Sequence, residues 1–277
     1  MRARLIGALG PLALLAGIGT GLNAQEQASQ SPPAWNVTVG VGAFAFPRYA
    51  GSDEYRVLPF PILSVSFRDR LYLGPSATGV GFALGAYAIR TARLGFALEV
   101  GGQDSRPASR AGALTGLDDR DGVATAGARL SYRIGPLESA VGIVKGFNDG
   151  AGIVGTARVS VSHSVGRFMI TAGGSAGVAD ARQMRREFGV TDAEAARRRS
   201  LIASGHARLR AADGIAHSPG GGLRHLGVSV SLAYLVSRRW SLIAFGGGER
   251  LGGEAAASPL VRRREQFSGG VGLGYRF

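Results

Sequence analysis

The chain has 277 residues, no cysteine, 45 glycines and a net charge of +13 that is carried almost wholly by arginine. The lack of cysteine excludes disulfides and thiolate metal sites, and glycine-rich apolar segments argue against a helical core because each glycine costs a helix about 1 kcal/mol relative to alanine. The positive charge indicates polyanionic neighbours such as nucleic acid, phosphorylated lipid or acidic polysaccharide.

The first residues have the organisation of a secretory signal peptide. Two arginines precede an apolar run over residues 5 to about 18, and small residues follow near Ala24. This order predicts a signal peptide over residues 1–24, cleaved after Ala24, and then a periplasmic segment over 25–34. The alternative, a single membrane anchor, needs a longer apolar run. Because the mature chain then works outside the cytoplasm, nucleic acid is not expected as a partner.

From Trp35 onward, apolar residues recur at every second position over ten or more residues. The stretches 35–45, 124–134, 226–236 and 267–277 show this most clearly. A period of two predicts strands with one apolar face. Strands of soluble proteins are usually about five or six residues long, whereas a tilted strand needs about 9–11 residues to cross a bilayer. The segments are of the longer kind.

The other face of these segments carries glycine, serine, alanine, threonine and a few charged residues. Soluble barrels fill their interior with bulky apolar side chains, whereas a transmembrane barrel encloses a polar interior within an apolar band. In lipid the sheet must also close on itself, because every backbone polar group needs a partner. The sequence therefore predicts an all-β fold, a transmembrane antiparallel β-barrel of the outer membrane, over residues 35–277.

The number of strands depends on how the stretch 70–85 is interpreted. Taken as one strand it gives eleven, but Gly74-Pro75 can divide it into two short strands, which gives twelve. Bacterial barrels have an even number, so we expect about twelve strands, with ten as the alternative. They are predicted near 35–47, 55–67, 70–76, 79–85, 92–104, 121–134, 136–148, 152–163, 166–179, 223–236, 239–251 and 263–277.

The connections between strands are short at one end and long at the other. Bacterial barrels place short turns in the periplasm and long loops outside, so we expect a long extracellular loop over residues 180–222. Thr191 and Glu194 form a capping-box pattern that predicts a short helix there. Two interpretations stay open for the arginines of this loop: they lie on a solvated helix that has no partner, or they bind lipopolysaccharide phosphates. They are Arg182, Arg185, Arg186, Arg197, Arg198 and Arg199.

Charged residues on the small-residue face are expected to point into the lumen. Two interpretations stay open for them: a network of opposite charges that stiffens the barrel, or the lining of a path for a small solute. The residues are Glu99, Arg129, Arg133, Glu138 and Arg158.

No catalytic, cofactor or metal site can be assembled from the sequence. His163 lies between two serines, but neighbouring strand residues point to opposite faces and cannot pair. His206 and His217 lack the spacing of metal ligands, and no chemistry is assigned to His225. The aspartates at 118, 119 and 121 lack the full pattern of a calcium loop. We therefore expect a non-enzymatic protein, with an enzyme acting on lipids as a remote alternative.

Four stretches together resemble the MipA/OmpV family, and the resemblance covers the chain from Trp35 to Phe277. They are "YAGSDEYRVLPFPILSVSFRDRLYL" (49–73), "FGVTDAEAA" (188–196), "GLRHLGVSVSLAYLVSRRWSL" (222–242) and "SPLVRRREQFSGGVGLGYRF" (258–277). The chain departs from the family pattern in "LGGEAAASPL" and in a longer stretch before residue 223. Both departures fall on expected outer loops, where external contacts are least transferable.

The resemblance implies a barrel in the outer membrane of a Gram-negative bacterium, reached after signal-peptide cleavage. It also implies a structural or scaffolding role with a murein transglycosylase or murein synthase as partner; a small-solute channel is the alternative function. The alternating C-terminal residues Leu273, Tyr275 and Phe277 are typical of barrels, and we expect them to act as the signal for the outer-membrane assembly machinery. Outer-membrane lipid and lipopolysaccharide complete the expected partners.

Overall fold

The computed structural model describes residues 34–76, 82–147 and 150–277. The expected signal peptide, nearly all of the segment 25–34 and residues 79–81 of one expected strand lie outside the described residues. None of the described helices is long and apolar enough to cross a membrane.

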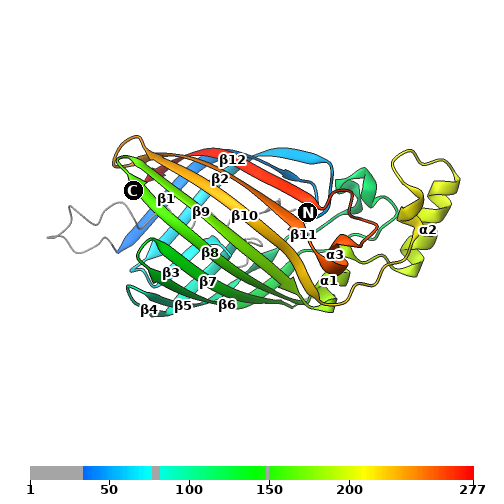
Figure 1. Ribbon diagram of the computed structural model, residues 1–277, viewed down its shortest axis with the longest axis horizontal. Coiled ribbons are helices and arrows are strands. Elements are labelled where there is room, and N and C mark those ends of the chain that lie inside the picture. The colour runs from blue at the N-terminus through cyan, green and yellow to red at the C-terminus, as the bar shows by residue number, and fades with distance from the viewer. Residues whose placement is uncertain (1–33, 77–81, 148–149) are drawn as a thin grey trace, which may run out of the picture.

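Twelve antiparallel strands close into one barrel, in which each strand pairs with its neighbours in sequence and β1 pairs with β12 (Figure 1). This confirms the predicted fold and the higher of the two strand counts. The strands are β1 (Trp35–Pro47), β2 (Tyr55–Phe67), β3 (Leu71–Pro75), β4 (Phe82–Arg90), β5 (Leu94–Gln103), β6 (Val123–Ile134), β7 (Leu137–Gly146), β8 (Ile153–Val165), β9 (Phe168–Ala179), β10 (Gly222–Leu235), β11 (Trp240–Leu251) and β12 (Glu265–Arg276).

The outer surface of the barrel is apolar. Large aliphatic side chains on it stay solvent-accessible, including Val41 at 68% and Val228 at 70%. Aromatic residues gather near the short turns, where Trp240 meets Tyr275 at 4.9 Å and Phe168 meets Tyr234 at 4.7 Å between ring centroids. An apolar band bordered by aromatic residues is the surface that a barrel presents to lipid.

The inner surface differs from the prediction on one side. Phe44 and Phe46 alternate with Ala43 and Ala45 on β1, so the two large rings point inward and the two small residues outward. We call the resulting inner cluster the aromatic wall; it consists of Phe44, Phe46, Leu58, Phe60, Ile62 and Phe245. The lumen is therefore apolar beside β1, β2 and β11, and the expectation of a wholly small and polar interior was wrong there.

Glycines make room for this wall. A Cβ atom on Gly270 would lie 2.7 Å from the carbonyl oxygen of Ala43 and would overlap the ring of Phe44, and Gly42 lies under the same ring. Gly270 of β12 is therefore needed where the ring of Phe44 packs against the neighbouring strand.

The long-loop end carries the helices (Figure 1). They are α1 (Ala181–Phe188), α2 (Asp192–Ala203), α3 (Gly253–Ala256) and the 3-10 turns η2 (Ala108–Arg110), η3 (Gly112–Leu114) and η4 (Ala211–Gly214). The capping box of Thr191 and Glu194 begins α2, as predicted. The sequence interpretation missed α1, whose first turn is capped by Asp180 through the amide of Gln183.

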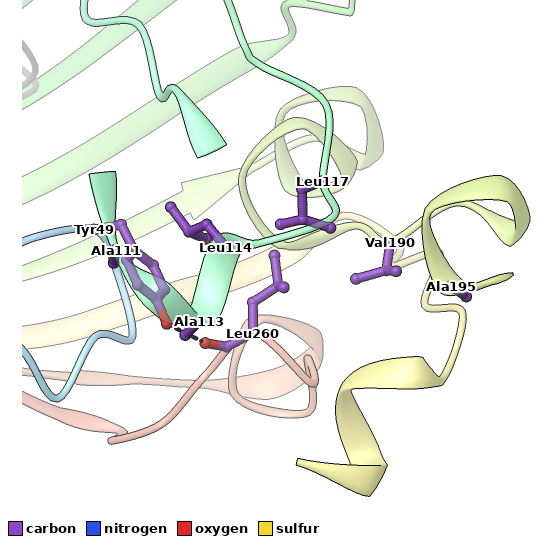
Figure 2. Packing of buried hydrophobic residues seen from close by; sticks show 8 residues of the cluster. All are labelled: Tyr49, Ala111, Ala113, Leu114, Leu117, Val190, Ala195 and Leu260. Atoms are coloured by element: carbon purple, nitrogen blue, oxygen red, sulfur yellow. Dashed lines mark hydrogen bonds between the residues drawn. The ribbon is translucent and has the colours of Figure 1, made fainter. Parts of the chain in front are cut away.

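Four loops at this end share one hydrophobic core, and we call them together the loop cap: residues 48–54, 104–122, 180–221 and 252–264. Its core consists of Tyr49, Ala111, Ala113, Leu114, Leu117, Val190, Ala195 and Leu260 (Figure 2). The Tyr49 hydroxyl donates to the Leu260 carbonyl oxygen at 2.9 Å. The β1–β2, β5–β6 and β9–β10 loops leave the barrel a third of the ring apart, so a core that joins them lies across the mouth.

Candidate functional site

Polar side chains line the lumen along β3 to β6, next to the aromatic wall. Glu99 on β5 accepts hydrogen bonds from the Tyr72 hydroxyl at 3.2 Å and the Ser76 hydroxyl at 2.7 Å. Arg129 on β6 donates to the Tyr87 hydroxyl at 2.9 Å, and its guanidinium lies 5.2 Å from the Tyr72 ring centroid. These contacts tie four neighbouring strands together, which is what a stiffening network does.

The five charges expected in the lumen fall into two groups. Glu99 and Arg129 are inside, and Arg158 on β8 acts electrostatically on both of them. Arg133 and Glu138 also lie on the inner face, but at the short-turn end, where they are exposed and pair with each other. The structure therefore brings together three of the five.

A buried carboxylate joins two loops of the loop cap. Glu194 on α2 is fully buried and accepts hydrogen bonds from the amides of Thr191 at 2.8 Å and Asp118 at 3.0 Å, and from the Arg120 guanidinium at 3.1 Å. Burial alone would raise the pKa of Glu194, but the two amides and Arg120 lower it below its ordinary value. The charged form of Glu194 is thus the form that the loop cap stabilises.

A second buried cluster surrounds Asp213. Arg198 lies 3.6 Å from it with both side chains fully buried, and Arg262 forms a closer ion pair with the same carboxylate. Burial has the largest effect on the pKa of Asp213 and raises it above its ordinary value. Cationic arginines nearby act in the opposite direction, but they do not outweigh burial. Arg198 also donates to the Ala113 carbonyl oxygen at 2.9 Å. The expectation that Arg198 contacts lipopolysaccharide was therefore wrong, because its charge is used inside the protein.

The other five arginines of that expectation lie nearer the surface. Arg182 and Arg185 project from α1 and are exposed. Arg186 donates to the Asp121 carbonyl oxygen, Arg197 pairs with Asp118 at 2.6 Å, and Arg199 donates to the Gly214 carbonyl oxygen at 2.8 Å. Arg186 and Arg197 thus join the 180–221 loop to the 104–122 loop, Arg199 holds its own loop together, and Arg182 and Arg185 are left as exposed cations on a helix.

A third ionic group lies where α1 meets the barrel. Glu187 accepts from Arg224 at 2.7 Å and from Gln183 at 2.7 Å. Burial would raise the pKa of Glu187, but Arg224 lowers it below its ordinary value. His225, beside Arg224 on β10, lies 3.8 Å from Glu249. These contacts hold α1 against the long-loop end of the barrel.

The described residues contain no arrangement that suggests catalysis. His163 points outward from β8, whereas Ser162 points inward and pairs with Thr171 at 2.9 Å. His217 binds the carbonyl oxygen of Glu254, within the loop cap. Over the described parts of the chain, no three His, Asp or Glu residues come together in a way that could hold a metal ion.

Arginines surround the short-turn end, a feature that sequence reasoning missed. Each short turn has at least one in it or on the strand ends beside it, and we call the set the basic rim: Arg68, Arg70, Arg90, Arg93, Arg133, Arg167, Arg238, Arg239 and Arg276. Only two acidic side chains, Asp69 and Glu138, accompany these nine on the described turns. The loop cap, in contrast, holds fifteen arginines beside twelve acidic residues. The excess of positive charge is therefore at the short-turn end.

The turn between β2 and β3 keeps charged residues at a conformational cost. Arg68 and Asp69 both have positive φ angles, 47° and 52°. At two of the other short turns this region of φ is occupied by glycine, Gly135 and Gly166. An L-residue in the left-handed region costs roughly 1–2 kcal/mol, so Arg68 occupies a place where folding alone would favour glycine. Residues held in this way are candidates for function.

The family model described as MltA-interacting protein MipA matches residues 39–277. The chain belongs to this family. The match confirms the resemblance drawn from the sequence, and the molecule is an outer-membrane β-barrel of the MipA family.

Solved structures of several outer-membrane proteins are similar to the chain at low identity. The NanC porin has a TM-score of 0.43 and 8% identity, covering 88% of this chain and 100% of its own. An outer membrane channel from Pseudomonas putida has a TM-score of 0.43 and 13% identity, covering 91% of this chain and 98% of its own. No curated protein matches the sequence. Function is therefore argued from the family and from the geometry of this chain.

Proposed function

We propose that the protein is a non-enzymatic scaffold of the outer membrane whose basic rim binds a murein transglycosylase on the periplasmic side. The orientation places the short turns in the periplasm, as in other bacterial barrels. The family description names an interaction with MltA, and the one-sided distribution of arginine supplies a surface on which an acidic protein face can dock.

The observation that carries this proposal is the charge difference between the two ends of the barrel. Nine arginines against two acidic residues at the basic rim leave an excess of positive charge, whereas the fifteen arginines of the loop cap lie among twelve acidic residues and six of them form ion pairs there. The strained turn at Arg68 adds a second, independent sign that this end is used.

Pull-down from detergent-solubilised envelopes tests the proposal. The altered protein carries Arg68→Glu with Arg70→Glu, and the matched control carries Arg182→Glu with Arg185→Glu, which is the same charge change at the opposite end. We expect the transglycosylase to be recovered with the unaltered protein and the control, and roughly tenfold less with the rim variant. Failure to recover a periplasmic murein enzyme with the unaltered protein would refute the proposed scaffold function.

Salt dependence separates this surface from an apolar one. Exposed charges are screened at a distance of about 8 Å in physiological salt and about 3 Å in 1 M salt, so recovery should fall steeply as salt is raised. Recovery that is unchanged at 1 M salt would show that the arginines do not provide the contact.

Two further partners are part of the proposal. Arg182 and Arg185, the exposed cations of α1, provide lipopolysaccharide contacts at the long-loop end. Leu273 and Tyr275 on the outer face of β12, together with Phe277, which directly follows the strand and is 72% exposed, provide the signal read by the assembly machinery.

A small-solute channel is the second candidate, and the lumen charges Glu99, Arg129 and Arg158 favour it. The loop cap lies across the mouth, so any axial path has to pass between its loops. Planar-bilayer recording of the purified, heat-modifiable protein decides the point. Discrete openings would support the channel, and their absence would remove it.

A further inference from the structure

The inner faces of β8, β9 and β10 carry hydroxyl groups midway along the strands. These three strands are neighbours in the sheet (Figure 1). Ser160 of β8 and Ser229 of β10 are both paired with Gly173 of β9, one from each side. Ser175 is the next inner residue of β9 after Gly173. We call Ser160, Ser175 and Ser229 the hydroxyl patch.

The hydroxyl patch has unused hydrogen-bonding capacity. All three side chains are half-buried, and the residues between and beside them, Gly173 and Gly227, have no side chain to cover them. Within the described parts of the chain, none of the three hydroxyls has a hydrogen-bond partner, whereas Ser162 and Thr171 of the same wall bond to each other at 2.9 Å. Each hydroxyl of the patch is therefore free to donate to a bound group.

Arg158 lies at the edge of this patch. It is paired with Ser175 across β8 and β9 and precedes Ser160 by two residues, so the three side chains share the inner face. Its side chain is partly exposed, and it forms no ion pair with any described residue. The charge that acts on it most strongly is another cation, Arg129, ahead of the carboxylate of Glu99, which already accepts from two hydroxyls.

The other carboxylates of the described inner wall are engaged elsewhere. Glu138 pairs with Arg133 at the short-turn end, and Glu249 lies 3.8 Å from His225. Arg158 is therefore a cation inside the barrel without a carboxylate of its own. A charged group that is partly removed from water is stabilised when it pairs with an opposite charge, so this position favours an anion.

The arrangement fits a phosphate group. Neighbouring strands lie about 4.8 Å apart and alternate residues of one strand about 6.7 Å apart, so the long Arg158 side chain and the three hydroxyls can converge on one oxyanion over Gly173. A guanidinium binds two phosphate oxygens side by side, and the hydroxyls then bind the remaining oxygens. A carboxylate has only two oxygens and would leave part of the patch unbound.

We propose that Arg158 and the hydroxyl patch bind a phosphate group in the lumen, either free or carried by a small solute. The site consists only of described residues on three neighbouring strands. It goes beyond the scaffold function and does not require that the barrel conducts.

Thiol chemistry tests the site, because the chain contains no cysteine and an introduced one is the single target. Ala140→Cys places a thiol on the inner face of β7, directly opposite Arg158. Ser268→Cys, on the inner face of β12 and four strands away from β8, is the matched control. Heat modifiability verifies that each variant is a folded barrel. If Ala140→Cys does not fold, Ser131→Cys, which pairs with position 140 from β6, replaces it.

Two methanethiosulfonate reagents, one with a sulfonate and one with a trimethylammonium group, compare the electrostatic potential at the two positions. We expect the ratio of the anionic to the cationic rate constant to be at least roughly tenfold higher at 140 than at 268, because a wall of one charge concentrates counter-ions. Arg158→Gln should abolish that difference. An equal ratio at both positions, an unchanged ratio in Arg158→Gln, or no reaction at 140 would overturn the proposal.

Protection by added anions tests the ligand. Inorganic phosphate, glycerol 3-phosphate and acetate are compared at constant ionic strength, with the uncharged methyl methanethiosulfonate as the reagent. We expect phosphate to slow the reaction several-fold at 140 and not at 268, and acetate to slow it less. Slowing by glycerol 3-phosphate as well would identify a phosphate-bearing solute as a ligand, and slowing by inorganic phosphate alone would identify free phosphate. Equal slowing by acetate, or none by either phosphate, would overturn the proposal.

Two variants separate charge from geometry. Arg158→Lys keeps the charge without the planar fork, so it should keep the reagent preference and lose most of the protection by phosphate. Ser175→Ala should weaken the protection and leave the reagent preference unchanged. Full protection in Arg158→Gln would overturn the role of Arg158. Because none of these residues belongs to the basic rim, recovery of the transglycosylase should be the same in Arg158→Gln, and the two proposals fail separately.

Discussion

Glu194 holds two loops of the loop cap together, and its removal should loosen that cap while leaving the barrel intact. Its side chain is fully buried and accepts four hydrogen bonds: from the amide and hydroxyl of Thr191, from the amide of Asp118 and from Arg120. In Glu194→Ala these donors stay in place without an acceptor.

The expected cost follows from that geometry. Breaking a buried ion pair by removing one partner costs about 3–5 kcal/mol, and the same substitution removes the capping box of α2, which is included in that range. Each 1.36 kcal/mol corresponds to a factor of ten, so the lower value gives a roughly hundredfold larger open population of the loop cap. The barrel strands share no hydrogen bond with Glu194 and should not respond.

Amide hydrogen exchange of residues 104–122 and 192–203 measures this, because exchange in a locally opening unit reports its opening free energy. Asp192→Asn, on the exposed side of the same helix, is the matched control and should leave exchange unchanged. Unaltered protection of both segments in Glu194→Ala would refute the reasoning. Loss of heat modifiability would also refute it, since it would show that the cap and the barrel unfold together.

Three further predictions concern the barrel, its assembly and acid. Gly270→Val should prevent formation of the heat-modifiable barrel because its side chain would overlap the ring of Phe44, whereas Gly246→Ala on the lipid side should fold normally, since its nearest atom is 3.9 Å away; equal yields of folded barrel would contradict this. Deletion of Phe277 should lower the amount assembled in cells but change the thermal stability of the assembled fraction little, because its ring is 72% exposed; normal assembly would remove its role as a signal. The pKa of Glu187 is held below its ordinary value, so the stabilising contribution of this carboxylate is present above about pH 4.3 and is lost as pH falls through the lowered pKa. Amide hydrogen exchange of α1, corrected for intrinsic rates, should therefore accelerate on acidification. Constant protection down to pH 3 would contradict this.

The strand alternation was enough to predict the barrel and the side on which most residues lie. In a strand the facing of each residue is set locally, because successive side chains point to opposite faces. The same alternation could have predicted the aromatic wall, which the sequence analysis missed, since Phe44 and Phe46 fall on the opposite face from Ala43 and Ala45. The division of 70–85 into two short strands was also predicted correctly, but Gly74 and Pro75 themselves lie in β3, where they pair with Ala83 and Phe82 of β4.

The surface proposed to bind a partner, the basic rim, could not be predicted from strand alternation. The arginines of the basic rim lie in separate short turns, and only closure of the sheet gathers them around one opening.

By itself, the sequence determined the class of fold and the onset of α2, because these follow from local periodicity and capping, whereas it left the strand count at twelve or ten. Only the tertiary structure decided that the loops close over the mouth and that Arg198 is an internal charge paired with Asp213. The reason is physical: loop backbones have no period that reports facing, and the contacts that bury them join residues as far apart as Tyr49 and Leu260.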